Sequence, residues 1–159
     1  GIGAAATILV SSAHSKGDRK QVRHTVGIAL ILAEAVALLV LVGLILGRNY
    51  LGYIFSDDPS IIAMAALAIL PMALYQPADA LQVIYSNALR GMEDVKQMAL
   101  YACGVHLIIA PALCLLFGFG LGLEGGGIQL TAVWSAFPVS LLLLGFLLKR
   151  RFDRISIPR

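Results

Sequence analysis

The composition of this chain excludes an ordinary soluble domain. Of its 159 residues, 59% are hydrophobic and only 13% are charged, whereas soluble domains contain about 45–50% apolar and about 25% charged residues. The mean hydropathy is +0.88. The formal net charge is +3, and we interpret the basic residues as orientation signals in a membrane, with no nucleic-acid partner.

In chain order, the hydrophobic pattern predicts one partial helix and four full spans, because a span needs roughly 20 mostly apolar residues. The expected helices cover about 1–14, 22–47, 59–90, 97–118 and 127–148, followed by a basic tail at 149–159. The predicted fold class is an all-α, polytopic helical membrane bundle. The chain begins GIGAAATILV, without an initiator Met or a basic n-region. This start predicts a fragment of a longer membrane protein and argues against a signal peptide.

The Lys and Arg residues predict the orientation of the spans. With four crossings, every one of these residues except Arg48 falls on one side, in HSKGDRKQVRH (14–24), in the turn after the third helix and in the tail. Lys and Arg are enriched in cytoplasmic loops. We therefore expect a multi-pass protein of the cell membrane whose C-terminus is cytoplasmic.

The helix expected at 59–90 has clear end signals. Asp57 or Asp58 can cap its start, and Pro59 suits the first helical position, where a missing N–H does no harm. Arg90 and Gly91 are typical of a helix end, with a cation near the negative end of the dipole followed by a residue that turns freely.

The same helix carries a polar stripe. Tyr75, Asp79, Gln82 and Ser86 are spaced four, three and four residues apart, which places them on one face. Pro77 cannot donate to the carbonyl group of Ala73, so it frees an acceptor and predicts a hinge or kink. Such a stripe is incompatible with a lipid-facing position.

Three ionisable residues are predicted to lie near the bilayer midplane. Asp79, Glu34 and His106 are each roughly 15–16 Å along a helix from the nearest basic residue. A charge at that depth costs at least ~2.5–3 kcal/mol. A proton or a monovalent cation such as Na⁺ would compensate Asp79, with tyrosine and carbonyl oxygens as further ligands.

Less specific readings of these residues remain open. Asp79 could instead be a structural hydrogen-bonding residue, and Gln82 and Ser86 could line a pathway or only hold helices together. Glu34 lies on an otherwise apolar helix without a stripe, and His106 could be an interhelical donor. No catalytic constellation, phosphate loop or metal-ligand Cys/His spacing is present, so we expect no enzyme, no cofactor and no metal beyond a coupling Na⁺.

The order of the motifs resembles one family. SSAHSKGDRKQVR, YIFSDDPSII and LYQPADALQVIYSNALRGMEDVK are similar to the C-terminal lobe of multidrug and toxic compound extrusion (MATE) transporters. The resemblance covers essentially the whole chain. It implies the last five helices, the first one partial, of a two-lobe, twelve-helix transporter. The basic tail that follows the last span favours the second lobe over the first.

The resemblance also implies a function. Family members exchange cationic amphipathic drugs for Na⁺ or H⁺. In a subset, an acidic residue on the tenth helix and a tyrosine one turn earlier form part of the cation site, a pattern that Asp79 and Tyr75 match. The expected partners are small organic cations, the lipid bilayer and the rest of the transporter chain. The alternatives are a related lipid-linked oligosaccharide flippase, which predicts cationic pathway residues, and a non-transporting scaffold subunit, for which the stripe is dispensable.

Overall fold

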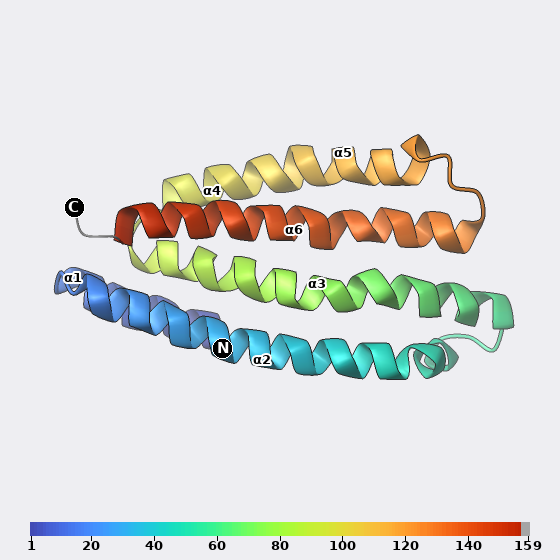
Figure 1. Cartoon of the computed structure of the whole chain (residues 1–159), viewed down its shortest axis with the longest axis horizontal. Helices are drawn as coiled ribbons and strands as arrows, with labels where there is room; N and C mark the ends of the chain where they lie inside the picture. The colour runs from blue at the N-terminus through green and yellow to red at the C-terminus, as the bar shows by residue number, and fades with distance from the viewer. Residues whose placement is uncertain (157–159) are drawn as a thin grey trace.

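The computed structural model describes residues 1–156, and this portion of the chain is an antiparallel array of long helices (Figure 1). Four helical segments are long and apolar enough to cross a membrane. The helices in chain order are α1 (Ile2–Ser15), α2 (Arg19–Leu51), η1 (Gly52–Ile54), α3 (Pro59–Gly91), α4 (Val95–Gly104), η2 (Val105–Ile109), α5 (Ala110–Leu115), η3 (Leu116–Gly120) and α6 (Gly126–Ser156).

Aspartates set the starts of the two longest helices. Asp18 accepts a hydrogen bond from the backbone N–H of Gln21 at 2.9 Å, which caps α2. Asp58 accepts one from the N–H of Ser60 at 2.8 Å, and Pro59 occupies the first position of α3. These bonds satisfy N–H groups that have no partner within a helix. Of the two caps considered for α3, the structure therefore uses Asp58.

One continuous helical run, 95–120, forms the fourth crossing, and it is not a regular α-helix. Its η2 and η3 segments are π-helical, which the hydrophobic pattern did not predict. Pro111 follows η2 and cannot donate an N–H bond to the carbonyl group of Leu107, which accounts for the widened turn just before it.

α3 lies at the centre of the array, between α2 and α6 (Figure 1). α1 packs against both α2 and α3, and the 95–120 run packs against α6. Glycines allow two close helix approaches. A Cβ atom at Gly91 would lie 2.7 Å from the carbonyl oxygen of Thr7, and one at Gly145 would lie 2.7 Å from the Cδ2 atom of Leu81. Small residues at such crossings are typical of membrane helices.

The buried core lies toward one end of the array. Its fully buried members include Val10, Val22, Ile84, Leu89 and Leu144. The turns after α1 and α3 and the end of α6 meet at this same end (Figure 1), and they carry the basic residues expected on the cytoplasmic side. By contrast, large apolar side chains such as Leu39 and Leu46 are 75% exposed, as expected for a surface that contacts lipid or other helices.

The helices extend beyond the predicted limits. α2 covers 19–51 where 22–47 was expected, and α6 continues to Ser156 where a helix end at 148 and a solvated tail were expected. The predicted tail residues 157–159 lie outside the described portion of the chain.

Side-chain contacts at the end of α6 explain its extension. Arg151 binds Asp94, at the start of α4, through two hydrogen bonds: Nε to Oδ2 at 2.6 Å and Nη2 to Oδ1 at 3.1 Å. Phe152 is buried against Tyr85, with ring centroids 5.6 Å apart. The basic side chains at 149–156 thus belong to a helix that is docked on α3 and α4.

Candidate functional site

Asp79 lines a groove between α1, α2 and α3. The groove has a volume of about 400 Å³. Its walls combine small residues from all three helices with branched apolar side chains around the half-buried carboxyl group; the small residues include Gly3, Ala33, Ala37 and Ala80, and the branched ones include Val36 and Ile84. Such walls leave room for an ion or a ligand group beside Asp79.

Tyr75 lies one helical turn before Asp79, and its hydroxyl group interacts with the carboxyl group of that residue. Both side chains are half-buried. A phenolic O–H donates to a carboxylate and also offers an oxygen to a cation. The two residues predicted as a coupling pair are therefore neighbours with compatible chemistry. Their role in coupling stays a prediction.

The rest of the predicted stripe is engaged within α3. The Nε2 atom of Gln82 donates to the Oγ atom of Ser86 at 3.2 Å, and Ser86 is buried. Neither residue belongs to the lining of the Asp79 groove. In this structure the two residues bond each other within α3, so this bond neither joins α3 to another helix nor lines the groove. Whether the pair lines a pathway or holds helices together stays a prediction.

α3 passes through its internal prolines without interruption. Pro77 leaves the carbonyl group of Ala73 without its usual helical donor, and Ala73 is fully buried. The freed acceptor lies about one turn from Asp79. A hinge at Pro77 remains a prediction, because the helix is continuous here.

Glu34 and His106 are not brought to the Asp79 groove. The groove uses Ala33, Val36, Ala37 and Val40 of α2 and not Glu34, which is half-buried. His106 is exposed in η2, beside the exposed Leu107. The three ionisable residues were predicted to lie at a similar depth in the bilayer, but a similar depth did not place them in the same groove.

Gln76 is a site residue that the spacing argument missed. It follows Tyr75, and it lines the groove with Asp79. Its amide makes one long bond, 3.4 Å, to the carbonyl group of Met72. The available signal was its position three residues before Asp79, which places both residues on the groove side of the helix.

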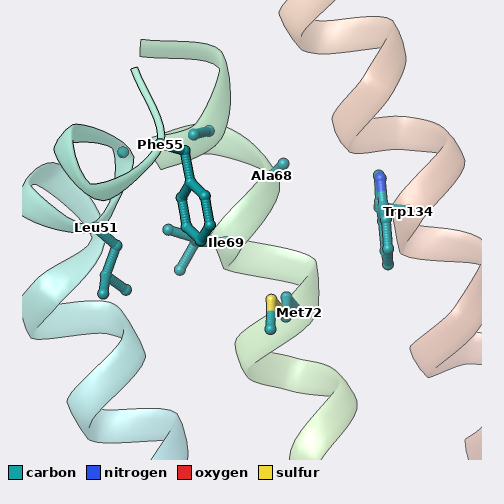
Figure 2. Close-up of a pocket in the computed structure, with 8 residues that line it drawn as sticks. Leu51, Phe55, Ala68, Ile69, Met72 and Trp134 are labelled. Atoms are coloured by element: carbon teal, nitrogen blue, oxygen red, sulfur yellow. The ribbon is translucent and has the colours of Figure 1, made fainter. Parts of the chain in front are cut away.

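A second, apolar pocket lies at the opposite end of α3 from the buried core. It has a volume of about 220 Å³. Figure 2 shows Phe55 reaching from the turn after α2 toward Ile69 of α3, with Trp134 on the neighbouring α6. Met72 also lines it, two helical turns before Asp79. The same face of α3 thus lines an aromatic, apolar pocket and, two turns further along, carries the carboxyl group of Asp79.

The site offers oxygen ligands and no transition-metal constellation. Within residues 1–156, no group of three or more His, Cys, Asp or Glu side chains is placed to hold a metal ion. The oxygens of Asp79, Tyr75 and Gln76 suit a proton or a hard monovalent cation. A carboxylate in such surroundings is also a binding partner for an organic cation.

Comparisons with known proteins agree with this architecture. A family model described as MatE matches residues 1–116. The chain is similar to the "Probable multidrug resistance protein NorM" of Neisseria meningitidis serogroup B, with 29% identity over 88% of the chain. It is also similar to the protein of the same name in Bradyrhizobium diazoefficiens, with 34% identity over 98%, and to "Protein DETOXIFICATION 17" of Arabidopsis thaliana, with 34% identity over 91%.

The chain covers 29%, 33% and 30% of these three relatives, so it spans about a third of their length. Among solved structures, it resembles the eukaryotic MATE transporter AtDTX14 with a TM-score of 0.72 and 23% identity. That match covers 98% of this chain and 36% of the other chain. A match at this identity supports the fold.

The helices and these matches define the chain as part of a multi-pass, all-α membrane protein. It belongs to the MatE family, which confirms the resemblance seen in the motifs around Asp79. The predicted all-α membrane fold is confirmed as well.

Proposed function

We propose that this chain is the C-terminal-lobe segment of an ion-coupled antiporter that exports cationic, amphipathic compounds from the cell. The observation that carries the proposal is the Asp79 carboxyl group, half-buried in a groove of small and branched apolar residues with the Tyr75 hydroxyl beside it. The names of the NorM relatives support multidrug export.

Coupling follows from competition for one negative charge. A carboxylate in a low-dielectric site is stable only when a proton, Na⁺ or an organic cation compensates it. If the ion and the drug bind Asp79 in turn, each lowers the affinity for the other, and this reciprocal effect links the ion gradient to export. Pro77 would allow the helix to move as the occupant changes.

The basic ends of the helices support an orientation in the cell membrane. The turns after α1 and α3 and the end of α6 would face the cytoplasm, together with the C-terminus, because Lys and Arg favour that side. The aromatic pocket at Phe55 and Trp134 would then lie toward the external side.

The test uses a full-length transporter that contains this chain, carrying Asp79→Asn. The substitution keeps the shape of the side chain and removes its charge. We expect normal membrane levels and a loss of gradient-driven export of a fluorescent organic cation by more than about tenfold, which corresponds to about 1.4 kcal/mol. The matched control is Asp57→Asn, in the exposed external turn, which keeps export unchanged. Normal export by the Asp79 variant would exclude this residue from coupling.

The coupling ion is identified separately. Export is measured in Na⁺-free buffer with a pH gradient, and with an inward Na⁺ gradient but no pH gradient. A Na⁺-coupled transporter works only in the second condition, and a proton-coupled one only in the first. Export in the absence of both gradients would contradict the antiport mechanism.

A further inference from the structure

We propose that a groove between α1 and α2 binds an anionic phospholipid of the cytoplasmic leaflet, with its headgroup at the helix ends and one acyl chain between the helices. The groove has a volume of about 340 Å³ and does not share its lining with the Asp79 groove except for Ile2. The inference concerns a different face of the molecule from the transport site.

The lining of this groove is polar at one end and apolar at the other. On α2, Gln21, His24 and Thr25 line the end near the start of the helix, and Ile28 and Leu32 line the groove further along the same helix. This order matches a phospholipid, whose polar headgroup lies at the membrane surface and whose chains run toward the midplane.

α1 supplies a second wall with the same order. It runs antiparallel to α2, so Leu9 lies nearer the turn between the helices and Ile2 lies deeper, with Ala5 and Ala6 between them. The alanines keep this wall shallow, and Leu9 and Ile28 leave large exposed surfaces, 57% and 46%. An acyl chain in the groove would cover these side chains.

The charged residues at the end of the groove near the turn between α1 and α2 indicate which kind of lipid would bind there. The turn before α2 and the first turn of α2 carry Lys16 and Lys20, both exposed, and neither forms an ion pair within the described residues. The one carboxylate between them, Asp18, is already used to cap α2. Lys20 lies one turn before His24, so both side chains are on the same side of the helix.

This combination favours an anionic over a zwitterionic headgroup. Lysine side chains extend along apolar surface to place their ammonium groups at the membrane surface, and basic pockets between helices on the cytoplasmic side bind anionic headgroups. The N–H donors of Gln21 and His24 suit phosphate oxygens. An uncharged detergent-like molecule would use the apolar walls but not the lysines.

The experiment places a tryptophan reporter in the groove. A full-length transporter that contains this chain, without other tryptophans, carries Ile28→Trp and is reconstituted with phosphatidylglycerol or phosphatidylcholine brominated on its acyl chains. We expect brominated phosphatidylglycerol to reach half-maximal quenching at a mole fraction at least about fivefold lower than brominated phosphatidylcholine, given the size of the attraction per basic residue. The control reporter is Leu107→Trp, an exposed position in η2, part of the 95–120 run that packs against α6, where both lipids quench alike.

The charge dependence is tested by adding Lys16→Gln and Lys20→Gln to the Ile28→Trp protein. Arg19 and Arg23 remain to orient the helix. With both lysines replaced, the preference for phosphatidylglycerol should fall by at least about fivefold, which leaves the two lipids nearly equal, while quenching at Leu107→Trp stays unchanged. Equal quenching by the two lipids at Ile28→Trp would show nonselective lipid contact and overturn the proposal. Weak quenching by both lipids would show that another protein segment covers the groove, which overturns it as well.

Discussion

α2 and α3 have the same length, 33 residues each, and opposite characters. Of the most apolar 18-residue stretch of each helix, 11% is buried in α2 and 28% is buried in α3. α2 carries one carboxylate there, Glu34, and no proline, while α3 carries Pro71, Pro77 and a series of polar side chains.

This difference shows where a membrane helix tolerates polarity. α3 lies at the centre of the array (Figure 1), so neighbouring helices and its own side chains can satisfy polar groups that lipid cannot. Little of α2 is buried among the described residues, and its sequence is correspondingly uniform. Polar residues on the packed helix are therefore stronger candidates for function than the single acid on the outer helix.

The largest expected effect concerns the two acids. In a full-length transporter, Glu34→Gln should keep export of a fluorescent cation within about twofold of wild type, because Glu34 does not line the Asp79 groove. A twofold change is well below about 1.4 kcal/mol. The Asp79→Asn variant should lose this export. Export by everted membrane vesicles measures both, with protein levels matched. Equal losses would mean that α2 takes part in coupling and that the contrast between the helices is wrong.

The next effect concerns close packing. Gly91→Ala should destabilise the protein by about 1–3 kcal/mol, because the added Cβ atom meets the carbonyl oxygen of Thr7 at 2.7 Å. Gly43→Ala on α2 is the matched control, since no atom lies within 4 Å of its added Cβ, and alanine favours helix. Thermal unfolding of the purified transporter should show a lower Tm for the first variant alone. A similar Tm for both would mean that α1 does not pack this closely against α3.

A smaller effect concerns the docked end of α6. Breaking the Arg151–Asp94 pair should cost about 1–2 kcal/mol, because both side chains are mostly buried, with 26% and 16% of their surface exposed. A double-mutant cycle with Arg151→Gln and Asp94→Asn measures the coupling in chemical unfolding. The Lys149–Asp153 pair, 45% and 35% exposed, is the control and should couple less. Additive effects at Arg151 and Asp94 would indicate a solvated tail.

The smallest effect is the pH dependence of the α3 cap. Hydrogen bonds from the side chain and backbone of Ser60 hold the pKa of Asp58 below its ordinary value of 3.8. A carboxylate with a lowered pKa stabilises the folded state above its unfolded pKa, and this contribution is lost as the pH falls through its folded pKa. Wild-type Tm should therefore fall slightly more than that of Asp58→Asn between pH 5 and pH 3. Parallel curves would contradict the cap.

Much of the fold could be predicted from the sequence, because hydrocarbon imposes a length and a composition on each span. The start of α3 at Pro59 followed from local capping chemistry. Its end was predicted only to within a residue or two: Gly91, expected to turn freely, is the last helical residue and packs against α1, and the residue with a positive φ is Glu93. The π-helical turns at 105–109 and 116–120 were not predicted, because a π turn only shifts the helical phase of the following residues, and a shift of phase leaves no mark on a span that is apolar on all sides. The extension of α6 depends on a contact between Arg151 and Asp94, which are far apart in the sequence.

The candidate site could be predicted only partially, for a similar reason. Helical spacing identified the Tyr75–Asp79 neighbourhood, because a single helix fixes that relation. Gln76 was missed, and Gln82 and Ser86 turned out to bond each other. Whether Glu34 faces the groove depends on the rotation of α2 about its own axis. The depth of a residue along a helix does not predict that rotation.

The central claim is that an organic cation and the coupling ion share the Asp79 carboxyl group. The most direct measurement is equilibrium binding of a fluorescent organic cation to a purified full-length transporter, titrated with Na⁺ at fixed pH and with protons at fixed Na⁺. We predict that one of the two ions raises the apparent Kd of the cation in proportion to its concentration, as a competitor does, and that Asp79→Asn abolishes this dependence. A Kd that is independent of both ions, or an ion dependence that persists in Asp79→Asn, would contradict the account.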